Sequence, residues 1–292
     1  MREIVVKAPA KLNLALDIVG VNEDHYHKMK MIMQTIDLFD VITIQLTDDE
    51  IQLSCNRPEV PCNQHNIAYR CAQALMEYMG ILTYGFKIDI QKQIPIQAGM
   101  AGGSADGAAV LVGLNELYQL GLSVQQLCEI GAKVGADIPF CIIGGTAKVE
   151  GIGEVIIPID PMPDCIFAIA KPKTGISTQK AFMDFDLAQI PPRLDLEQMI
   201  TAIKQQDIYQ MSNHMYNALE QVCTVRDIQI IRNKMLSFGA KNAMMTGSGS
   251  AVFGVFTNAA RAYECEQKLK SKYSETFLCK PIPYGCRVVK TE

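Results

Sequence analysis

A glycine-rich run in the first half of the chain has the residue types that an anion-binding loop needs. It covers residues 95–109, reads PIQAGMAGGSADGAA, and continues into an apolar, alanine-rich stretch expected to be a helix ending near Gln119. Gly99, Gly102 and Gly103 can take backbone angles that residues with a Cβ avoid, so consecutive N–H groups can point at one oxyanion. The helix N-terminus adds partial positive charge. We therefore expect this run to hold a phosphate group.

The spacing of the glycines narrows the kind of phosphate loop. The run lacks the lysine that G-x-x-x-x-G-K-[ST] would place after its last glycine, and it lacks the G-x-G-x-x-G of dinucleotide folds and protein kinases. For the run by itself a second interpretation stays open. A stretch rich in Gly, Ala and Ser before a helix is often a flexible connector with a serine cap.

Three predicted elements lead polar side chains toward this run. Residues 12–18 alternate between aliphatic and small or polar types, which predicts a strand with Lys11 at its start and Asn13 on the face opposite the leucines. A second alternating strand, residues 86–90, leads through Lys92 to the run. Asn66 precedes a helix with apolar residues at helical spacing, so it can act as an N-cap. A solvated edge charge is the alternative interpretation for Lys11.

Asp137 and a second glycine turn extend the list of candidate residues. Asp137 precedes an apolar, helix-like run with a proline in its first turn, so capping alone is one interpretation. Residues 243–253 predict strand, glycine turn and strand, in which Gly247 and Gly249 let the backbone fold back toward the phosphate loop. Residues 41–46 and 51–54 predict two strands paired across a turn that includes Asp48 and Asp49.

The bulk composition fits a cytosolic enzyme. The 292 residues are 49% apolar and 20% charged, and a net charge of −4 leaves no basic footprint for a nucleic acid. No apolar run could span a bilayer, and the first residues look like a short strand rather than a signal peptide. The 10 cysteines are scattered without a C-x-x-C pair, so we expect reduced, buried thiols and no protein-bound metal. Proline-rich residues 158–163 predict a junction between domains at residues 1–160 and 161–292.

Three motifs together resemble those of the GHMP kinases. They are Pro-x-Lys-x-Asn-Leu at residues 9–14, Pro-x-x-x-Gly-x-x-Gly-Gly-Ser-x-x-x-Ala at residues 95–108, and the glycine turn within residues 243–253. The resemblance covers nearly the whole chain. It implies an α+β, two-domain GHMP kinase fold, with an N-terminal domain like domain 2 of ribosomal protein S5 and a C-terminal ferredoxin-like domain. The active site would lie in the cleft between them.

The resemblance also implies ATP and Mg²⁺ as cofactors and assigns roles to individual residues. Asp137 matches the catalytic aspartate, which would act as a base, and Lys11 would keep it ionised. Ser104 is a candidate contact to the Mg²⁺-phosphate unit. The residues implied to bind ATP are Asn66, Lys92, Pro95, Ala98, Gly99, Met100, Ala101, Gly102, Gly103, Ser104 and Ala105.

Residues 24–27, Asp-His-Tyr-His, resemble the Asp-Gly-Tyr-His element of GHMP kinases that phosphorylate the C2 hydroxyl of 4-diphosphocytidyl-2-C-methyl-D-erythritol in non-mevalonate isoprenoid biosynthesis. His25 stands where that family has glycine, which would alter the turn. The match implies that Tyr26 and Phe182 sandwich cytosine while His27 hydrogen-bonds its edge, although Phe182 could equally be a core aromatic. The residues implied to bind substrate are Asn13, Tyr26, His27, Thr178, Phe182, Gly247 and Ser248.

Two alternatives remain at this point. One is another small-molecule GHMP kinase, acting on mevalonate, homoserine or a sugar, which would not require the Tyr-His element. The other is an S5-like nucleic-acid-binding module, against which the acidic charge balance speaks. For the kinase we expect a small-molecule substrate, no nucleic-acid or membrane partner, and a monomer or weak homodimer.

Overall fold

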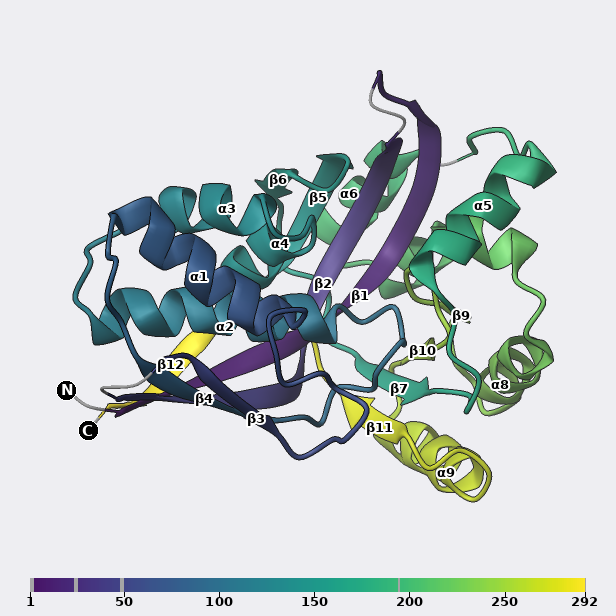
Figure 1. Ribbon diagram of the computed structural model, residues 1–292. Coiled ribbons are helices and arrows are strands. Elements are labelled where there is room, and N and C mark those ends of the chain that lie inside the picture. The colour runs from purple at the N-terminus through teal and green to yellow at the C-terminus, as the bar shows by residue number, and fades with distance from the viewer. Residues whose placement is uncertain (1–2, 24–25, 48–49, 194, 292) are drawn as a thin grey trace.

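The computed structural model describes the chain except residues 1–2, 24–25, 48–49, 194 and 292 (Figure 1). Its first sheet is built on two long antiparallel strands, β1 (Glu3–Val21) and β2 (His27–Leu46). Shorter strands extend this sheet: β3 (Gln52–Cys55), β4 (Phe86–Gln91), β5 (Thr146–Gly151), β6 (Val155–Pro158), β8 (Tyr216–Asn217) and β12 (Arg287–Thr291).

The predicted partner of the strand at residues 51–54 is wrong. β3 pairs in parallel with β4, and β4 lies between β3 and β2 in the sheet. The two strands are therefore not a hairpin across residues 48–49, which lie outside the described residues. Alternation along a strand fixes which side chains share a face, but it does not name the neighbouring strand.

Four helices cover the first sheet on one side (Figure 1): α1 (Ile67–Met79), α2 (Gly102–Leu117), α3 (Val124–Ala132) and α4 (Ile138–Ile143). α2 is the central one and its small residues allow close packing. A Cβ at Gly107 would lie 2.8 Å from the Cys71 sulfur of α1, and one at Gly113 would lie 2.8 Å from Ile44 of β2. Ser123 and Gln126 form a capping box at the start of α3.

The second sheet is antiparallel, with the strand order β11-β7-β10-β9. Numbered along the chain, this is the order 4-1-3-2 of a βαββαβ ferredoxin-like unit. α8 and α9 pack against it, and α5 to α7 occupy the connection between its first two strands. These elements are β7 (Ile166–Ala170), α5 (Thr178–Ala188), α6 (Leu196–Lys204), α7 (Ile208–Asn213), the 3₁₀ turn Ala218–Val222, α8 (Arg226–Ser237), β9 (Ala243–Met245), β10 (Val252–Phe256), α9 (Ala259–Lys270) and β11 (Thr276–Cys279).

The two sheets are joined by a common apolar core and by the C-terminal strand, which returns to the first sheet. Buried side chains of β1 and α2 belong to the same apolar cluster as Phe167 and Phe253 of the second sheet. After β11 the chain returns, and β12 pairs with the beginning of β1 (Figure 1). The predicted α+β class is confirmed, whereas the boundary at residue 160 stays a prediction. None of the described helices is long and apolar enough to cross a membrane.

Candidate functional site

A cavity of about 1020 Å³ brings the predicted site residues together. Its wall is formed by both halves of the chain and includes every predicted site residue except Ala105. The structure places Ala105 in the core, where it is fully buried. The volume is at the upper end of the range for small-molecule sites, which suits a large ligand or two ligands side by side.

The glycine-rich run forms a turn directly before α2. Ala101 precedes the helix in a left-handed conformation, with φ of 57°, and no side chain caps the first turn. The N–H groups of Gly102, Gly103 and Ser104 therefore have no partner within the helix and remain available as donors. This arrangement suits an anion at the end of a helix of four turns.

The second glycine turn packs against the first. Ala251 N donates to Ala98 O at 3.2 Å, and Ser250 N donates to Gln97 O at 3.3 Å. A Cβ at Gly99 would lie 2.1 Å from the carbonyl oxygen of Thr246, and φ at this glycine is +72°. The predicted approach of the turn at residues 247–249 to the phosphate loop is thus present, and it explains why Gly99 has no side chain.

Lys11 and Asp137 lie next to each other in the wall of the cavity. Lys11 lies in β1, where its backbone N–H donates to Met100 O of the glycine-rich turn at 3.2 Å. Its ammonium is nearly buried, donates to Asn13 Oδ1 at 2.5 Å and lies 3.8 Å from Asp137 Oδ2. The predicted pair therefore exists, and Asn13 belongs to it.

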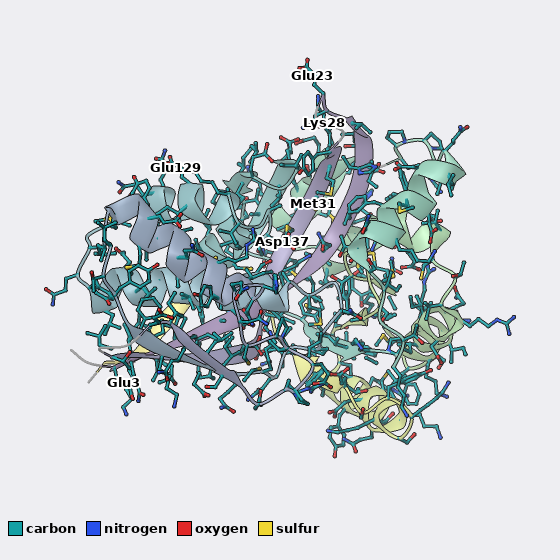
Figure 2. The ribbon with its side chains drawn as sticks, in the orientation of Figure 1. Glu3, Glu23, Lys28, Met31, Glu129 and Asp137 are labelled. Atoms are coloured by element: carbon teal, nitrogen blue, oxygen red, sulfur yellow. The ribbon has the colours of Figure 1, made fainter. Side chains whose placement is uncertain are left out.

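Asp137 occupies the N-cap position of α4 without capping it. Its side chain makes no cap hydrogen bond, and 36% of that side chain is exposed. Figure 2 shows it near the centre of the molecule, between the helices of the first half and the β1–β2 pair. The carboxylate therefore has lone pairs available to a ligand, so capping alone does not explain this residue.

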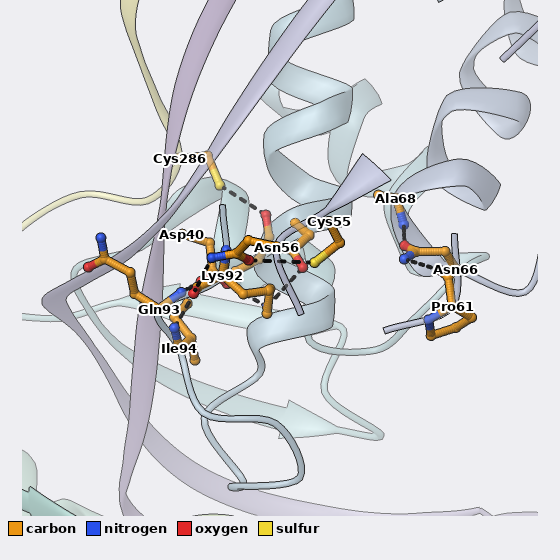
Figure 3. A network of polar contacts seen from close by, with 12 residues as sticks. Asp40, Cys55, Asn56, Pro61, Asn66, Ala68, Lys92, Gln93, Ile94 and Cys286 are labelled. Atoms are coloured by element: carbon orange, nitrogen blue, oxygen red, sulfur yellow. Dashed lines mark hydrogen bonds and ion pairs between the residues drawn. The ribbon is translucent and has the colours of Figure 1, made fainter. Parts of the chain in front are cut away.

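Lys92 is held in a buried cluster that the sequence did not reveal. Its ammonium lies 2.5 Å from Asp40 Oδ2 of β2 (Figure 3). It also lies 2.9 Å from Asp106 Oδ2 of α2. Asp40 Oδ1 also accepts from the backbone N–H groups of Gln93 and Ile94. The only hint in the sequence is a pair of acidic residues placed among apolar ones, where isolated charges are costly.

The charge balance of this cluster favours a proton on one carboxyl group. Burial raises the pKa of Asp106 well above its usual range, against the opposing effect of Lys92, and the nearby Asp40 raises it further. The pKa of Lys92 is also raised, because Asp106 and Asp40 together outweigh the effect of burial. Among the described residues, Asp106 Oδ1 has no hydrogen-bond partner and Lys92 is the one cation bonded to the two aspartates, as the raised pKa of Asp106 requires.

Both polar atoms of the Asn66 side chain have hydrogen-bond partners within the chain. Its Oδ1 accepts from Ala68 N at 2.8 Å and caps α1, and its Nδ2 donates to Pro61 O at 2.8 Å (Figure 3). The predicted cap is therefore confirmed. Asn66 also lines the cavity, so its contact with a nucleotide stays a prediction.

The far end of the cavity gathers the residues predicted to bind substrate. Thr178 Oγ1 and Ser248 Oγ are 3.0 Å apart, which joins α5 to the second glycine turn. Phe182 stacks on His27 with ring centroids 4.7 Å apart, while Tyr26 is 61% exposed. His25 lies outside the described residues. The sandwich of cytosine between Tyr26 and Phe182 stays a prediction.

The cysteines are free thiols, and Cys62 is the exposed one. Burial raises the pKa of Cys71 to about 12, and it also raises the pKa values of Cys141 and Cys286. Thiols of this kind are poor nucleophiles. The predicted burial is confirmed for six of the 10 cysteines, and none of the 10 lines the cavity.

Comparison with known proteins agrees with this geometry. The family model of the GHMP kinases N terminal domain matches residues 66–145, and that of the GHMP kinases C terminal matches residues 199–275. A 4-diphosphocytidyl-2-C-methyl-D-erythritol kinase of Alkaliphilus metalliredigens is 43% identical over 95% of this chain and 96% of its own length. One of Clostridium perfringens is 44% identical over 95% and 98%.

Solved structures show the same fold. A crystal structure of 4-(cytidine 5'-diphospho)-2C-methyl-D-erythritol kinase superposes with a TM-score of 0.80 at 26% identity, covering 95% of this chain and 99% of that one. Homoserine kinase from Cytophaga hutchinsonii gives a TM-score of 0.77 at 16% identity, over 99% and 98% of the two chains, and shows the fold alone. This chain belongs to the 4-diphosphocytidyl-2-C-methyl-D-erythritol kinase family of the GHMP kinases.

Proposed function

We propose that the chain transfers the γ-phosphoryl group of ATP to the C2 hydroxyl of 4-diphosphocytidyl-2-C-methyl-D-erythritol, a step toward isoprenoid precursors. The relatives at 43% and 44% identity carry the name of that kinase over nearly their whole length. The observation that carries the mechanism is the Lys11–Asp137 pair, which lines the same cavity as the uncapped start of α2.

The residues at the start of α2 fit a triphosphate. The free N–H groups of Gly102, Gly103 and Ser104 would bind phosphate oxygens, and the close packing at Gly99 keeps the turn rigid. The Ser104 hydroxyl would contact Mg²⁺, whose other ligands would come from the phosphates and water, because this ion is usually held by few protein groups. Bound together, ATP and Mg²⁺ supply the phosphoryl group and neutralise charge during its transfer.

Asp137 would act as the general base. Its partly exposed carboxylate would accept the proton of the C2 hydroxyl while the hydroxyl oxygen bonds to the γ-phosphorus and the bond from that phosphorus to the bridging oxygen breaks. The electron pair of the broken bond stays on ADP. Lys11, fixed by Asn13, balances the negative charge that passes across the site.

The other end of the cavity would hold the rest of the substrate. Thr178 and Ser248 offer adjacent hydroxyl groups for the polyol or the diphosphate. Phe182 would stack on a base, and His27 would hydrogen-bond the edge of that base. The exposed Tyr26 would cover the base from the other side.

A coupled assay of ADP release tests this assignment. We expect turnover that needs ATP, Mg²⁺ and the cytidine substrate together, with the new phosphate on C2 as located by phosphorus NMR. Mevalonate and homoserine, tested at the same concentrations, should give little turnover. Faster turnover with either of them than with the cytidine substrate would overturn the assignment.

A further inference from the structure

The ring of His27 is held between two side chains of α5. Phe182 stacks on one face, with an interplanar angle of 24°, and Asp186 Oδ1 lies 2.7 Å from His27 Nε2. Phe182 and Asp186 are four residues apart in α5, so they project from the same side of the helix. All three line the cavity, and the pair links the start of β2 to the second half of the chain.

The carboxylate of Asp186 determines which ring nitrogen carries the proton. An ionised carboxylate only accepts hydrogen bonds, so His27 Nε2 must be the donor. In the neutral imidazole the other nitrogen, Nδ1, is then an acceptor. Nδ1 makes no hydrogen bond to any residue in the described part of the chain, and 15% of the side chain remains exposed. The ring therefore keeps one acceptor for a ligand.

We propose that Asp186 is a positioning residue that fixes the Nε2–H form of His27, so that Nδ1 accepts from the exocyclic amine of a bound base and selects cytosine over uracil. The proposal rests on the proposed function and adds to it a source of base specificity. A cytosine presents an amine at its fourth position, whereas a uracil presents a carbonyl oxygen there. Two acceptors would then face each other, and neither could be satisfied.

A matched set of variants tests the role of Asp186. Asp186→Ala removes the acceptor, and Asp186→Asn keeps its size but can donate as well as accept, so that either form of the imidazole is allowed. Asp184→Asn is the control, because Asp184 lies on the same helix and its carboxylate binds Lys180 at 2.9 and 3.0 Å. Asp186 is 55% exposed, so each variant should fold, and thermal melting checks this.

The measurement is kcat/KM for the cytidine substrate and for its uridine counterpart. We expect Asp186→Ala and Asp186→Asn to lower the ratio of the two values roughly 10-fold, the worth of one hydrogen bond, and Asp184→Asn to leave it unchanged. Nitrogen NMR of His27 in the free protein, assigned with a His27→Gln variant, should show the proton on Nε2 in the wild type and a mixture in Asp186→Asn.

The outcomes separate this inference from the proposed function. The role of Asp186 is overturned if NMR of the wild type finds the His27 proton on Nδ1. It is also overturned if the ratio of kcat/KM for the cytidine and uridine substrates is unchanged in both Asp186 variants. Failure of the wild type to phosphorylate the cytidine substrate overturns the proposed function instead, and the base selectivity falls with it. The NMR result still decides whether Asp186 sets the form of the imidazole.

Discussion

Lys11 and Lys92 line the same cavity, and both are nearly buried, yet their partners differ. Lys92 has two carboxyl groups at 2.5 and 2.9 Å, those of Asp40 and Asp106. Lys11 has the neutral side chain of Asn13 at 2.5 Å and one carboxylate, Asp137, at 3.8 Å. Asp40 and Asp106 are almost completely buried, whereas a third of the Asp137 side chain is exposed.

The difference separates a lysine that stabilises the fold from one that can respond to a ligand. Breaking a buried ion pair leaves a charge without compensation, so the Lys92 cluster is costly to disturb. The longer Lys11–Asp137 contact leaves both groups able to move toward new partners. Burial alone would not have distinguished the two lysines, because the number and exposure of their partners carry the distinction.

The sharpest test of this comparison removes the base. Asp137→Asn should lower kcat roughly 10²- to 10⁴-fold, because the amide cannot accept the hydroxyl proton. The Kd for ATP should stay the same, since the phosphate loop is untouched. Rapid-quench kinetics and calorimetry measure the two quantities, and Asp164→Asn, a change of an exposed aspartate, is the control. A kcat near that of the wild type would remove Asp137 from its assigned role.

Making the same substitution at both lysines tests the comparison directly. Lys92→Met leaves Asp40 and Asp106 without a cation and should lower the free energy of unfolding by about 3–5 kcal/mol. Lys11→Met leaves only one carboxylate, already partly exposed, and should cost about 1 kcal/mol while greatly reducing turnover. Urea unfolding and steady-state kinetics give both values. Equal losses of stability would erase the distinction drawn here.

The pH dependence of stability reports on Asp106. Its raised pKa means that the folded protein keeps a proton which the unfolded chain has released. This contribution to stability is present below the ordinary Asp pKa of 3.8 and is lost as pH rises toward the folded-state value. Asp106→Asn stays neutral, so its free energy of unfolding should fall less with rising pH than that of the wild type.

The control for this measurement has the opposite sign. Hydrogen bonds from Lys272 and Tyr273 lower the pKa of Asp227. Its contribution is therefore present above the ordinary Asp pKa and is lost as pH falls through the lowered value. The free energy of unfolding, measured with denaturant at acidic and neutral pH, should therefore fall less with falling pH in Asp227→Asn than in the wild type. Identical curves for wild type and Asp106→Asn would show that Asp106 is ionised in the fold.

The smallest expected effect concerns Asn66. Like that of Lys92, its side chain already bonds to other residues of the chain. Asn66→Ala should cost about 1 kcal/mol of stability through loss of the cap on α1. Asn66→Ser keeps an uncharged acceptor for Ala68 N and should restore part of that loss, because only the hydrogen bond from Asn66 Nδ2 to Pro61 O stays missing. Nucleotide affinity measured in both variants separates the roles. A large rise in the Kd for ATP in Asn66→Ser as well would indicate a direct contact of the Asn66 amide with the nucleotide.

Local patterns in the sequence predicted the parts of the site that depend on neighbouring residues. The glycine-rich run, the capping of α1 and the strand that carries Lys11 each follow from spacing over a few residues. The pairing of Lys11 with Asp137 required the resemblance to a family, because 126 residues separate the two in the numbering of the chain.

Contacts between distant segments could not be predicted. Asp40 and Lys92 meet only because β2 and β4 are neighbours, and Asp186 reaches His27 across 159 positions of sequence. The position of β3 next to β4 is another contact that local patterns could not predict. Alternation and helical spacing give each element its buried face, whereas the choice of partner depends on the packing of the whole chain.

The return of β12 to β1 has a consequence for synthesis of the chain. The backbone groups along the outer edge of β1 at residues 4–7 remain open until Arg287–Thr291 has left the ribosome, because only then can the two strands pair. An open strand edge invites pairing with another chain. The nascent enzyme therefore carries an unprotected edge through most of its translation, and chaperone binding would be most useful there.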